Sequence, residues 1–175
     1  GENGLKELET VCWVLDICDA KVNDSCGFHV HMDAAGFNLD TWKNLALTYK
    51  HLEHLIDAFM PRTRRNNTYC KTLSGVSDER IKAVRTIDDL QEVFNNDRYH
   101  KVNFEAYSRH RTVEFRQHSG TTNFTKMENW IRFLNGLITF AKSSSLPSRM
   151  TLEGLPFLNG KQKLFFKLRT KKLAV

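Results

Sequence analysis

The 175-residue sequence has few of the features that mark non-globular chains. It contains three prolines and nine glycines, which excludes collagen-like, low-complexity and largely disordered proteins. No apolar run approaches the ~20 residues that a membrane helix requires, and the first residues lack the basic start and apolar stretch of a signal peptide. The sequence starts at Gly1 rather than Met, as expected for a processed, trimmed or internal piece. With 41% hydrophobic and 26% charged residues, it has the composition of one globular domain with a buried core.

Cysteines are also sparse. There are four, with no C-x-x-C pair among them: Cys12, Cys18, Cys26 and Cys70. A zinc finger needs paired ligands at short spacing, so this class of protein is disfavoured. A chain of this length does not need disulfides to be stable. We therefore expect reduced thiols and a cytoplasmic location.

Acidic residues are absent from the last fifteen positions, which hold six basic ones: Lys161, Lys163, Lys167, Arg169, Lys171 and Lys172. The net charge of +6 belongs to this segment, because the preceding residues contain 20 basic and 20 acidic side chains. A basic charge confined to one segment argues against a nucleic-acid-binding face that extends over the whole domain. We expect a basic amphipathic helix with Leu164, Phe165 and Leu168 on its apolar side. Such a helix packs on the domain and exposes its lysines, or binds nucleic acid, an acidic protein or an anionic membrane surface.

Hydrophobic periodicity predicts both helices and strands. Helices are expected at 5–19, 38–60, 77–84, 88–94, 125–143 and 161–173. Strict alternation predicts a strand over 26–33 and a β-hairpin within 99–118. The prediction is an α+β fold, with an antiparallel sheet and helices packed on one face. A Ser- and Pro-containing linker near 143–147 divides the chain into a domain over 1–145 and a basic helical extension over 146–175.

Local signals place the ends of several elements. Thr86 and Asp89 have the spacing of a capping box, and Thr125 and Glu128 have it as well. A tight connection over 108–110 is expected to join the two strands of the hairpin. These signals predict short, well-defined connections between the elements.

Ionisable side chains recur on one face of the predicted sheet. His29 and His31 alternate along the first strand, and Glu114, Arg116 and His118 share one face of the last hairpin strand. Imidazole and carboxylate groups suit a divalent metal, and an arginine beside them suits a phosphate or a developing negative charge. The alternative is a solvated strand face that binds nothing. The spacing alone leaves both interpretations open.

Two metal-binding families fit only in part. The segment 29–33 resembles the H-x-H-x-D opening of metallo-β-lactamase-like hydrolases, but Ala34 stands where a further histidine is expected. A cupin needs a glutamate a few residues after the histidine pair, and Asp40 is neither the right type nor well spaced. A metal-dependent hydrolase is therefore a third interpretation, which requires tight zinc binding and no nucleotide affinity.

Several blocks follow one another in a recognisable order. Residues 26–34 read C-G-F-H-V-H-M-D-A, 60–70 read M-P-R-T-R-R-N-N-T-Y-C, 98–103 read R-Y-H-K-V-N and 112–121 read T-V-E-F-R-Q-H-S-G-T, before N-W at 129–130. In this order, the blocks resemble the motifs of the amidoligase family, a group of glutamine-synthetase-like carboxylate–amine ligases. Its motifs include a C-G-x-H-V-H strand, a basic M-P-x-x-R-R-x-N-x-Y-C loop and a T-x-E-F-R-Q-H-S-G-T segment. The resemblance covers residues from about 4 to 142.

The resemblance implies a ligase that uses ATP and magnesium to phosphorylate a carboxylate, after which an amine displaces the phosphate and an amide forms. It also implies a glutamine-synthetase-like fold. Carried over position by position, His29, His31 and Glu114 would bind the metal, and Glu114 and Arg116 would be catalytic. Nucleotide or acidic-substrate groups would be bound by Arg64, Arg65, Asn66, Asn103 and His118. The partners are then a carboxylate and an amine, small or part of a peptide.

One family motif has no counterpart in this sequence. The family begins with a strand whose E-x-E motif supplies metal-binding carboxylates, whereas residues 1–4 lead almost directly into the first predicted helix. The expectation is a fold truncated at the N-terminus, in which magnesium lacks ligands. The alternative function is therefore an inactive amidoligase-like binding module, or an inhibitor of a protein or ribonucleoprotein partner, in a phage or bacterial accessory role.

Overall fold

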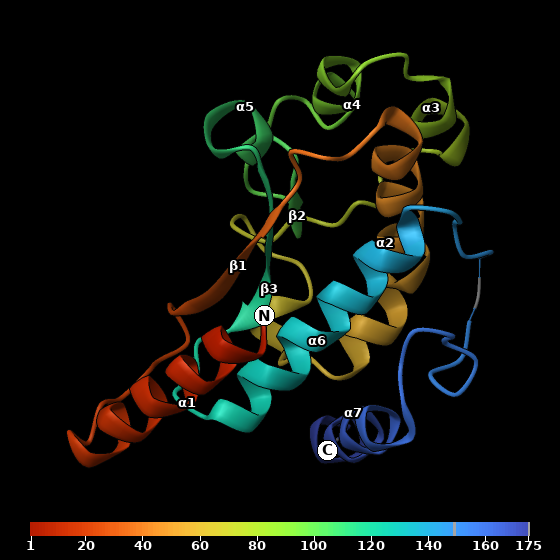
Figure 1. Ribbon diagram of the computed structural model, residues 1–175. Coiled ribbons are helices and arrows are strands. Elements are labelled where there is room, and N and C mark those ends of the chain that lie inside the picture. Colours follow the sequence, from red (N-terminus) through yellow and green to blue (C-terminus); the bar gives the residue numbers. More distant parts are fainter. Residues whose placement is uncertain (149, 175) are drawn as a thin grey trace.

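The computed structural model describes residues 1–148 and 150–174. Its helices are α1 (Glu2–Ile17), α2 (Leu39–Ala58), α3 (Asp78–Ala83), α4 (Ile87–Val93), α5 (Ala106–His110), α6 (Phe124–Ala141) and α7 (Gly160–Leu173), with a short 3-10 helix η1 (Arg62–Arg64). Its strands are β1 (Gly27–Asp33), β2 (Val102–Asn103) and β3 (Thr112–Ser119). Figure 1 shows the sheet beside the long helices α2 and α6. The expected combination of helices with a small antiparallel sheet is confirmed.

The strand β3 is the centre of the three-stranded sheet, which has the order β1-β3-β2 with both pairs antiparallel. His31 pairs with Glu114 on one face, and the next residue pair, Val30 with Phe115, lies on the other. One β-bulge interrupts the register between β1 and β3. The polar and apolar faces expected from the alternation are therefore present over the first half of β3.

The helices α2 and α6 pack against the apolar face. Tyr49 of α2 lies on Phe115 with 5.9 Å between ring centroids, and Trp130 of α6 is fully buried. Buried aromatic residues of this kind contribute most of the stabilisation of a small core. The core therefore lies between the sheet and these two helices, and leaves the opposite face of the sheet for polar side chains.

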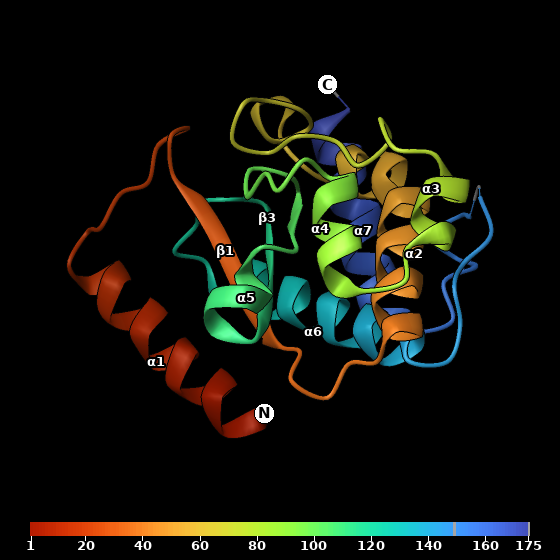
Figure 2. The ribbon, with the colours of Figure 1, turned by 90° about the horizontal axis from the view of Figure 1, so that it is seen from above.

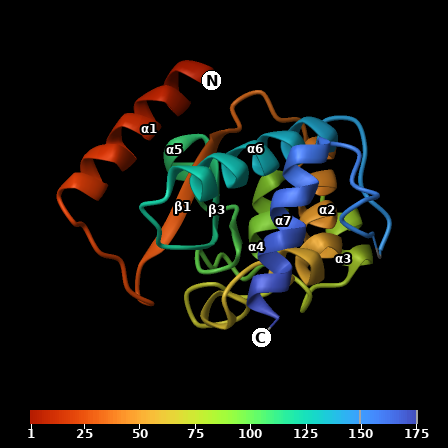
Figure 3. The same ribbon diagram turned by 90° about the horizontal axis from the view of Figure 1, so that it is seen from below.

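The C-terminal helix α7 belongs to the same core. Phe166 stacks on Phe59 at the end of α2 with 4.4 Å between ring centroids, and Figure 3 shows α7 lying across the long helices. The predicted apolar side of this helix is wrong, because Leu164 and Leu168 are each 57% exposed while Phe166 is buried. Phe166 packs among the aromatic side chains of α2 and α6. Leu164 and Leu168, two positions before and after it, therefore point to solvent.

The predicted hairpin forms only in part. β2 has two residues, and helix α5 replaces the expected tight connection to β3. The side-chain Oδ1 of Asn103 accepts a hydrogen bond from the backbone N–H of Glu105 at 2.9 Å, which turns the chain out of the strand. Phe104 then stacks on Phe94 with 5.0 Å between ring centroids. The alternating apolar residues of this segment therefore pack in a turn and a short helix.

One of the two expected capping boxes is confirmed. Thr86 and Asp89 cap α4 reciprocally. The other is wrong, because α6 begins earlier: Asn123 is its N-cap, and the Asn123 side chain accepts a hydrogen bond from the backbone N–H of Lys126 at 3.0 Å. Asparagine is among the strongest N-cap residues, which is why it fixes the start of α6.

The first helix, α1, lies at the outer edge of the molecule, at the opposite end from α3 (Figures 1 and 2). Glu2 forms an ion pair of 2.7 Å with Arg132 of α6, and Cys12 is buried with its sulfur 3.6 Å from that of Met127. All four cysteines are free thiols, as expected. None of the described helices combines the length and apolar character needed to span a bilayer.

Candidate functional site

The polar face of the sheet gathers five of the residues singled out in the sequence. β1 supplies His29 and His31, β2 supplies Asn103, and β3 supplies Glu114 and Arg116. The register explains this grouping, because Glu114 pairs with His31 on one side and with Asn103 on the other. Residues paired across antiparallel strands share a face. The sheet therefore brings together side chains that lie more than 80 positions apart in the sequence.

Glu114 is the centre of this cluster and is only 6% exposed. Its Oε1 accepts a hydrogen bond from Nη1 of Arg116 at 2.8 Å and lies 3.1 Å from Nδ1 of His29. Its Oε2 accepts one from Nδ2 of Asn103 at 2.6 Å. Burial by itself would raise the pKa of Glu114, but the hydrogen bonds from His29 and Asn103 and the positive charge of Arg116 hold this pKa at about 2. Glu114 is therefore a fixed anion at neutral pH.

Arg116 is equally well held. Besides Glu114, it contacts the backbone oxygen of Tyr69, to which its Nε donates at 3.4 Å, and its guanidinium lies over the ring of Tyr99. Nη2 makes no hydrogen bond to any of the residues that the structure describes. The arginine is thus oriented by the protein, while one of its donor groups has no partner among the described residues.

A pocket of about 200 Å³ opens beside this cluster. His31, Asn103 and Glu114 of the cluster line it, together with a second group of residues that includes Arg98, Glu105 and Arg109. This second group was not predicted from the sequence. Arg98 stands in a quoted block but carries no predicted role, and Glu105 and Arg109 lie where a plain hairpin was expected. The signal that was missed is the helix α5, which turns both side chains toward the pocket.

The oxygen atoms of this cluster do not suit magnesium. Mg²⁺ prefers octahedral oxygen ligands, whereas this face offers the single carboxylate of Glu114, both oxygens of which already accept hydrogen bonds. Across residues 1–148 and 150–174, no group of three or more His, Cys, Asp or Glu side chains is arranged to hold a metal ion. The residues that the structure describes do not fit a magnesium site, and metal binding by His29, His31 and Glu114 stays a prediction.

Arg64 is buried beside β3, where its guanidinium contacts the backbone at the β-bulge. The bulge sets two residues of β3 opposite His29 and leaves backbone oxygens without strand partners. The guanidinium of Arg64 donates to the oxygen of Arg116 and, at 3.3 Å, to that of Gln117. Buried carbonyl groups need such partners. In this structure Arg64 therefore holds the backbone of β3 at the bulge, next to the cluster.

Replacing Arg64 with methionine is expected to lower the free energy of unfolding by about 3 kcal/mol, because two buried carbonyl oxygens lose their donor. Urea unfolding checks this, with Arg62→Met as the matched control, since Arg62 is an exposed arginine of the same short helix. Equal stability of the two variants would show that the bulge does not depend on Arg64.

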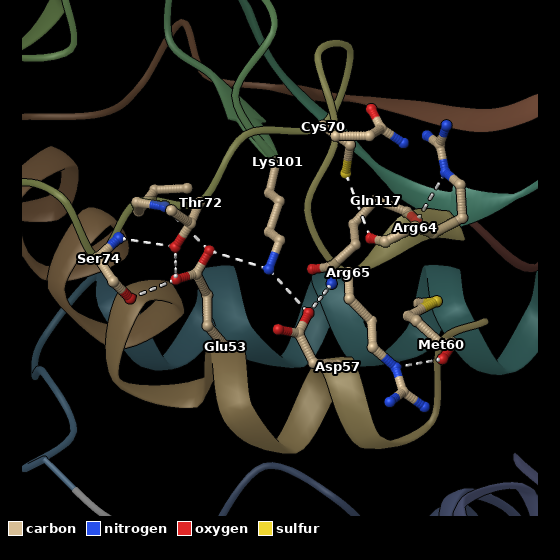
Figure 4. Close-up of polar contacts among 12 residues, drawn as sticks. Glu53, Asp57, Met60, Arg64, Arg65, Cys70, Thr72, Ser74, Lys101 and Gln117 are labelled. Carbon is tan, nitrogen blue, oxygen red and sulfur yellow. Dashed lines mark hydrogen bonds and ion pairs between the residues drawn. The ribbon is translucent and has the colours of Figure 1, made fainter. Parts of the chain in front are cut away.

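The neighbouring predicted nucleotide ligands do not join the cluster. Nε of Arg65 donates to the backbone oxygen of Met60 at 3.1 Å, and Figure 4 shows Arg65 and Arg64 pointing in opposite directions. Asn66 is exposed. Of the five residues assigned to nucleotide or substrate groups, Asn103 alone lies at the centre of the site, and the roles of the others stay predictions.

His118 does not lie on the face that the alternation predicts. After the bulge it pairs with Phe28 on the apolar face, and its ring lies 5.7 Å from that of Trp130. The extra residue in β3 shifts the alternation by one position and turns His118 into the core. Burial, together with the charges of Arg169 and Lys126, lowers the pKa of His118 to about 4, against the opposing effect of its hydrogen bond to the Ser119 oxygen.

This burial predicts a pH dependence of stability. The unfolded chain takes up a proton on His118 near pH 6.5, whereas the folded chain does so only near pH 4, so stability falls as the pH drops through this window. The expected loss is about 3 kcal/mol. Urea unfolding between pH 4 and 7 measures it. His118→Gln should flatten the slope while His54→Gln, at an exposed histidine, should not. Parallel curves for His118→Gln and the parent would contradict the prediction.

A second polar network, also missed in the sequence, connects the residue before β2 to α2 (Figure 4). Lys101 is 1% exposed, and its Nζ lies 3.2 Å from Oε1 of Glu53 and 2.7 Å from Oδ1 of Asp57. Glu53 in turn accepts hydrogen bonds from Thr72, Ser74 and the backbone N–H of Leu73. Burial is the main cause of the raised pKa of Asp57. The network fixes the segment that carries Tyr69 to the helix beneath it.

One comparison with known proteins gives a match that spans these motifs. A family model described as "Putative amidoligase enzyme" matches residues 1–138, which include the whole sheet and the cluster around Glu114. No curated protein and no solved structure matches the chain. The match covers most of the 175 residues. The chain therefore belongs to the amidoligase family.

Proposed function

We propose that this protein is an ATP-dependent carboxylate–amine ligase with a glutamine-synthetase-like architecture. The observation that carries the proposal is the buried Glu114–Arg116 pair beside a pocket lined by further charged groups. A buried, hydrogen-bonded ion pair is expensive to form unless it is well satisfied. Its position at the edge of a pocket, in a member of this family, favours a catalytic role over a purely structural one.

The proposed reaction has two steps. A carboxylate oxygen of the first substrate attacks the terminal phosphorus of ATP, which gives an acyl phosphate and ADP. The amine nitrogen of the second substrate then attacks the acyl carbon, so that a C–N bond forms, the C–O bond to phosphate breaks, and phosphate leaves with the electron pair. The amine loses one proton in this step. Both steps place negative charge on oxygens, which a fixed cation stabilises.

Each residue of the cluster has a part in this proposal. Arg116 donates from Nη2 to the transferred phosphoryl group or to the acyl phosphate. Glu114 holds the guanidinium in that orientation, and Asn103 holds Glu114. His29 and His31, whose side chains are 34% and 42% exposed, line the approach from β1. No step is assigned to a metal held by this chain, and magnesium enters as the Mg·ATP substrate.

Binding of Mg·ATP tests the proposal. At one hundred times its dissociation constant a ligand stabilises the folded state by about 2.7 kcal/mol, which a thermal-shift titration detects as a higher midpoint. We expect the parent protein and the Arg111→Gln control to show the shift, and Arg116→Gln to lose it. Arg111 is exposed and follows α5. The absence of a shift in the parent protein would contradict the proposed function.

Two observations favour a second candidate, a binding module without turnover. The described residues do not complete a magnesium site, and α1 and α7 expose large apolar side chains, among them Trp13, Ile17, Leu164 and Leu168. In α7 these leucines stand among lysines, which suits an acidic protein or nucleic-acid partner. A protein that binds no Mg·ATP but retains its fold would favour this candidate over the ligase.

A further inference from the structure

The first helix, α1, exposes a stripe of apolar side chains on the side that faces away from α6. Cys12 faces α6 and is buried, whereas Trp13 and Ile17 are 64% and 63% exposed. These two residues are four positions apart and therefore lie on the same face of the helix, and Val14, also exposed, lies beside them. An exposed tryptophan next to aliphatic side chains is typical of a surface that another molecule covers.

The C-terminal helix, α7, exposes a shorter apolar stripe that is surrounded by lysines. Leu164 and Leu168 are four positions apart and both are exposed. Lys161 precedes Leu164 by three positions and Lys171 follows Leu168 by three, so that these lysines lie on the same face of the helix. The exposed side of α7 is therefore apolar at its centre and positively charged around it.

The two stripes carry opposite charge. Helix α1 has four acidic residues and one basic residue, whereas α7 has six basic residues and no acidic one. Glu9 and Asp16 are exposed and lie one turn before and after Trp13. Within residues 1–148 and 150–174, no ion pair involves Glu9, Asp16, Lys161 or Lys171. These charges are therefore available to a partner.

We propose that α1 of one copy of this chain packs against α7 of another, with the apolar stripes in contact and Glu9 and Asp16 beside Lys161 and Lys171. Contacts between two α1 helices or two α7 helices would bring like charges together, which disfavours them. Figures 2 and 3 show the sheet and α6 between α1 and α7 of the same chain. The contact therefore joins different copies, and because each copy carries both surfaces, it builds a ring or an open chain.

The mass and the tryptophan fluorescence of the full chain test this inference together. Light scattering should give a mass that rises above that of one chain as the protein concentration increases. The fluorescence should shift to shorter wavelength over the same range, because Trp13 becomes buried while Trp42 and Trp130 are already buried in one chain. A mass of one chain at about millimolar concentration, or assembly without the fluorescence shift, would overturn the inference.

Two double variants identify the surfaces that meet. Trp13→Ser/Ile17→Ser and Leu164→Ser/Leu168→Ser change exposed side chains, and each variant alone should have the mass of one chain. An equal mixture should form a one-to-one complex, because each variant keeps the stripe that the other lacks. Tyr69→Ser, at an exposed aromatic residue outside both helices, is the control and should assemble like the parent. Assembly of either double variant alone, or no complex in the mixture, would overturn the inference.

An exchange of charges tests the complementarity of the stripes. Glu9→Lys/Asp16→Lys gives a chain in which both helices are basic, and Lys161→Glu/Lys171→Glu makes α7 more like the acidic α1. Each variant alone should associate at least about tenfold more weakly than the parent, and their mixture should recover association, because unlike surfaces then meet. A mixture that stays dissociated would overturn the inference. The pocket beside the cluster is lined by residues within 31–114, outside both helices, so these outcomes are independent of Mg·ATP binding.

Discussion

Replacing Glu114 with glutamine is expected to reduce ligase turnover at least about a hundredfold, a loss typical of removing one well-placed charge-stabilising group or its support. Without the carboxylate, Arg116 loses the contact at 2.8 Å that orients it. The measurement is ADP release from Mg·ATP in the presence of hydroxylamine and a panel of amino acids and dicarboxylates. Unchanged turnover would remove Glu114 from the mechanism.

The same substitution should also destabilise the fold, which the sequence alone did not suggest. Arg116 is 5% exposed, and a buried charge that loses its partner costs about 3–5 kcal/mol. The double variant Glu114→Gln/Arg116→Gln removes both charges and should regain much of this stability without regaining turnover. A double variant that recovers both would show that the lost activity reflects unfolding rather than chemistry.

Replacing Lys101 with methionine should lower the free energy of unfolding by about 3–5 kcal/mol. The ammonium group of Lys101 neutralises Glu53, which is 4% exposed, and contacts Asp57 as well. Methionine fills a similar volume but leaves the carboxylate of Glu53 buried without its cation, and breaking a buried pair costs about this much. Guanidinium or urea unfolding at pH 7 measures the change.

A matched pair of variants isolates the role of the Lys101 charge. Lys101→Met/Glu53→Gln should recover part of the lost stability, because no uncompensated charge is left in the interior. Lys71→Met is the surface control, since Lys71 pairs with Asp97 but its side chain is 43% exposed, and an exposed pair contributes at most about 1 kcal/mol. Similar losses of stability for Lys71→Met and Lys101→Met would show that burial does not increase the contribution of the Lys101 ion pairs.

The sequence predicted much of the sheet because its strands alternate. The polar positions His29, His31, Glu114 and Arg116 do share a face, as their period of two requires. The alternation could not reveal the bulge, since an inserted residue changes the pairing without leaving a break in the apolar pattern. For this reason the predicted face is wrong for His118, whereas it is confirmed for Glu114, four positions earlier.

The alternation of polar and apolar residues could not predict the roles of side chains whose partners lie far away in the sequence. The run of arginines in the loop after α2 indicates an anion site, yet Arg64 binds carbonyl oxygens of β3. Lys101 looks like the solvent-facing residue of an edge strand, but two carboxylates of α2 draw it into the interior. In both cases the partner lies 44 to 53 positions away, beyond the reach of local pattern. Glu105 and Arg109 were missed because α5 replaces a turn.

The order in which the molecule assembles follows from the connectivity of β3. This strand contacts β1 across 81 positions of sequence, at His31 and Thr112, and it receives Arg64 across 52. Loops of such length must close before these contacts contribute any free energy, which slows folding. We therefore expect the face around Glu114 to form late in folding, after α2. Its amide protons should exchange with solvent only when the whole molecule unfolds, so that their protection reports global stability.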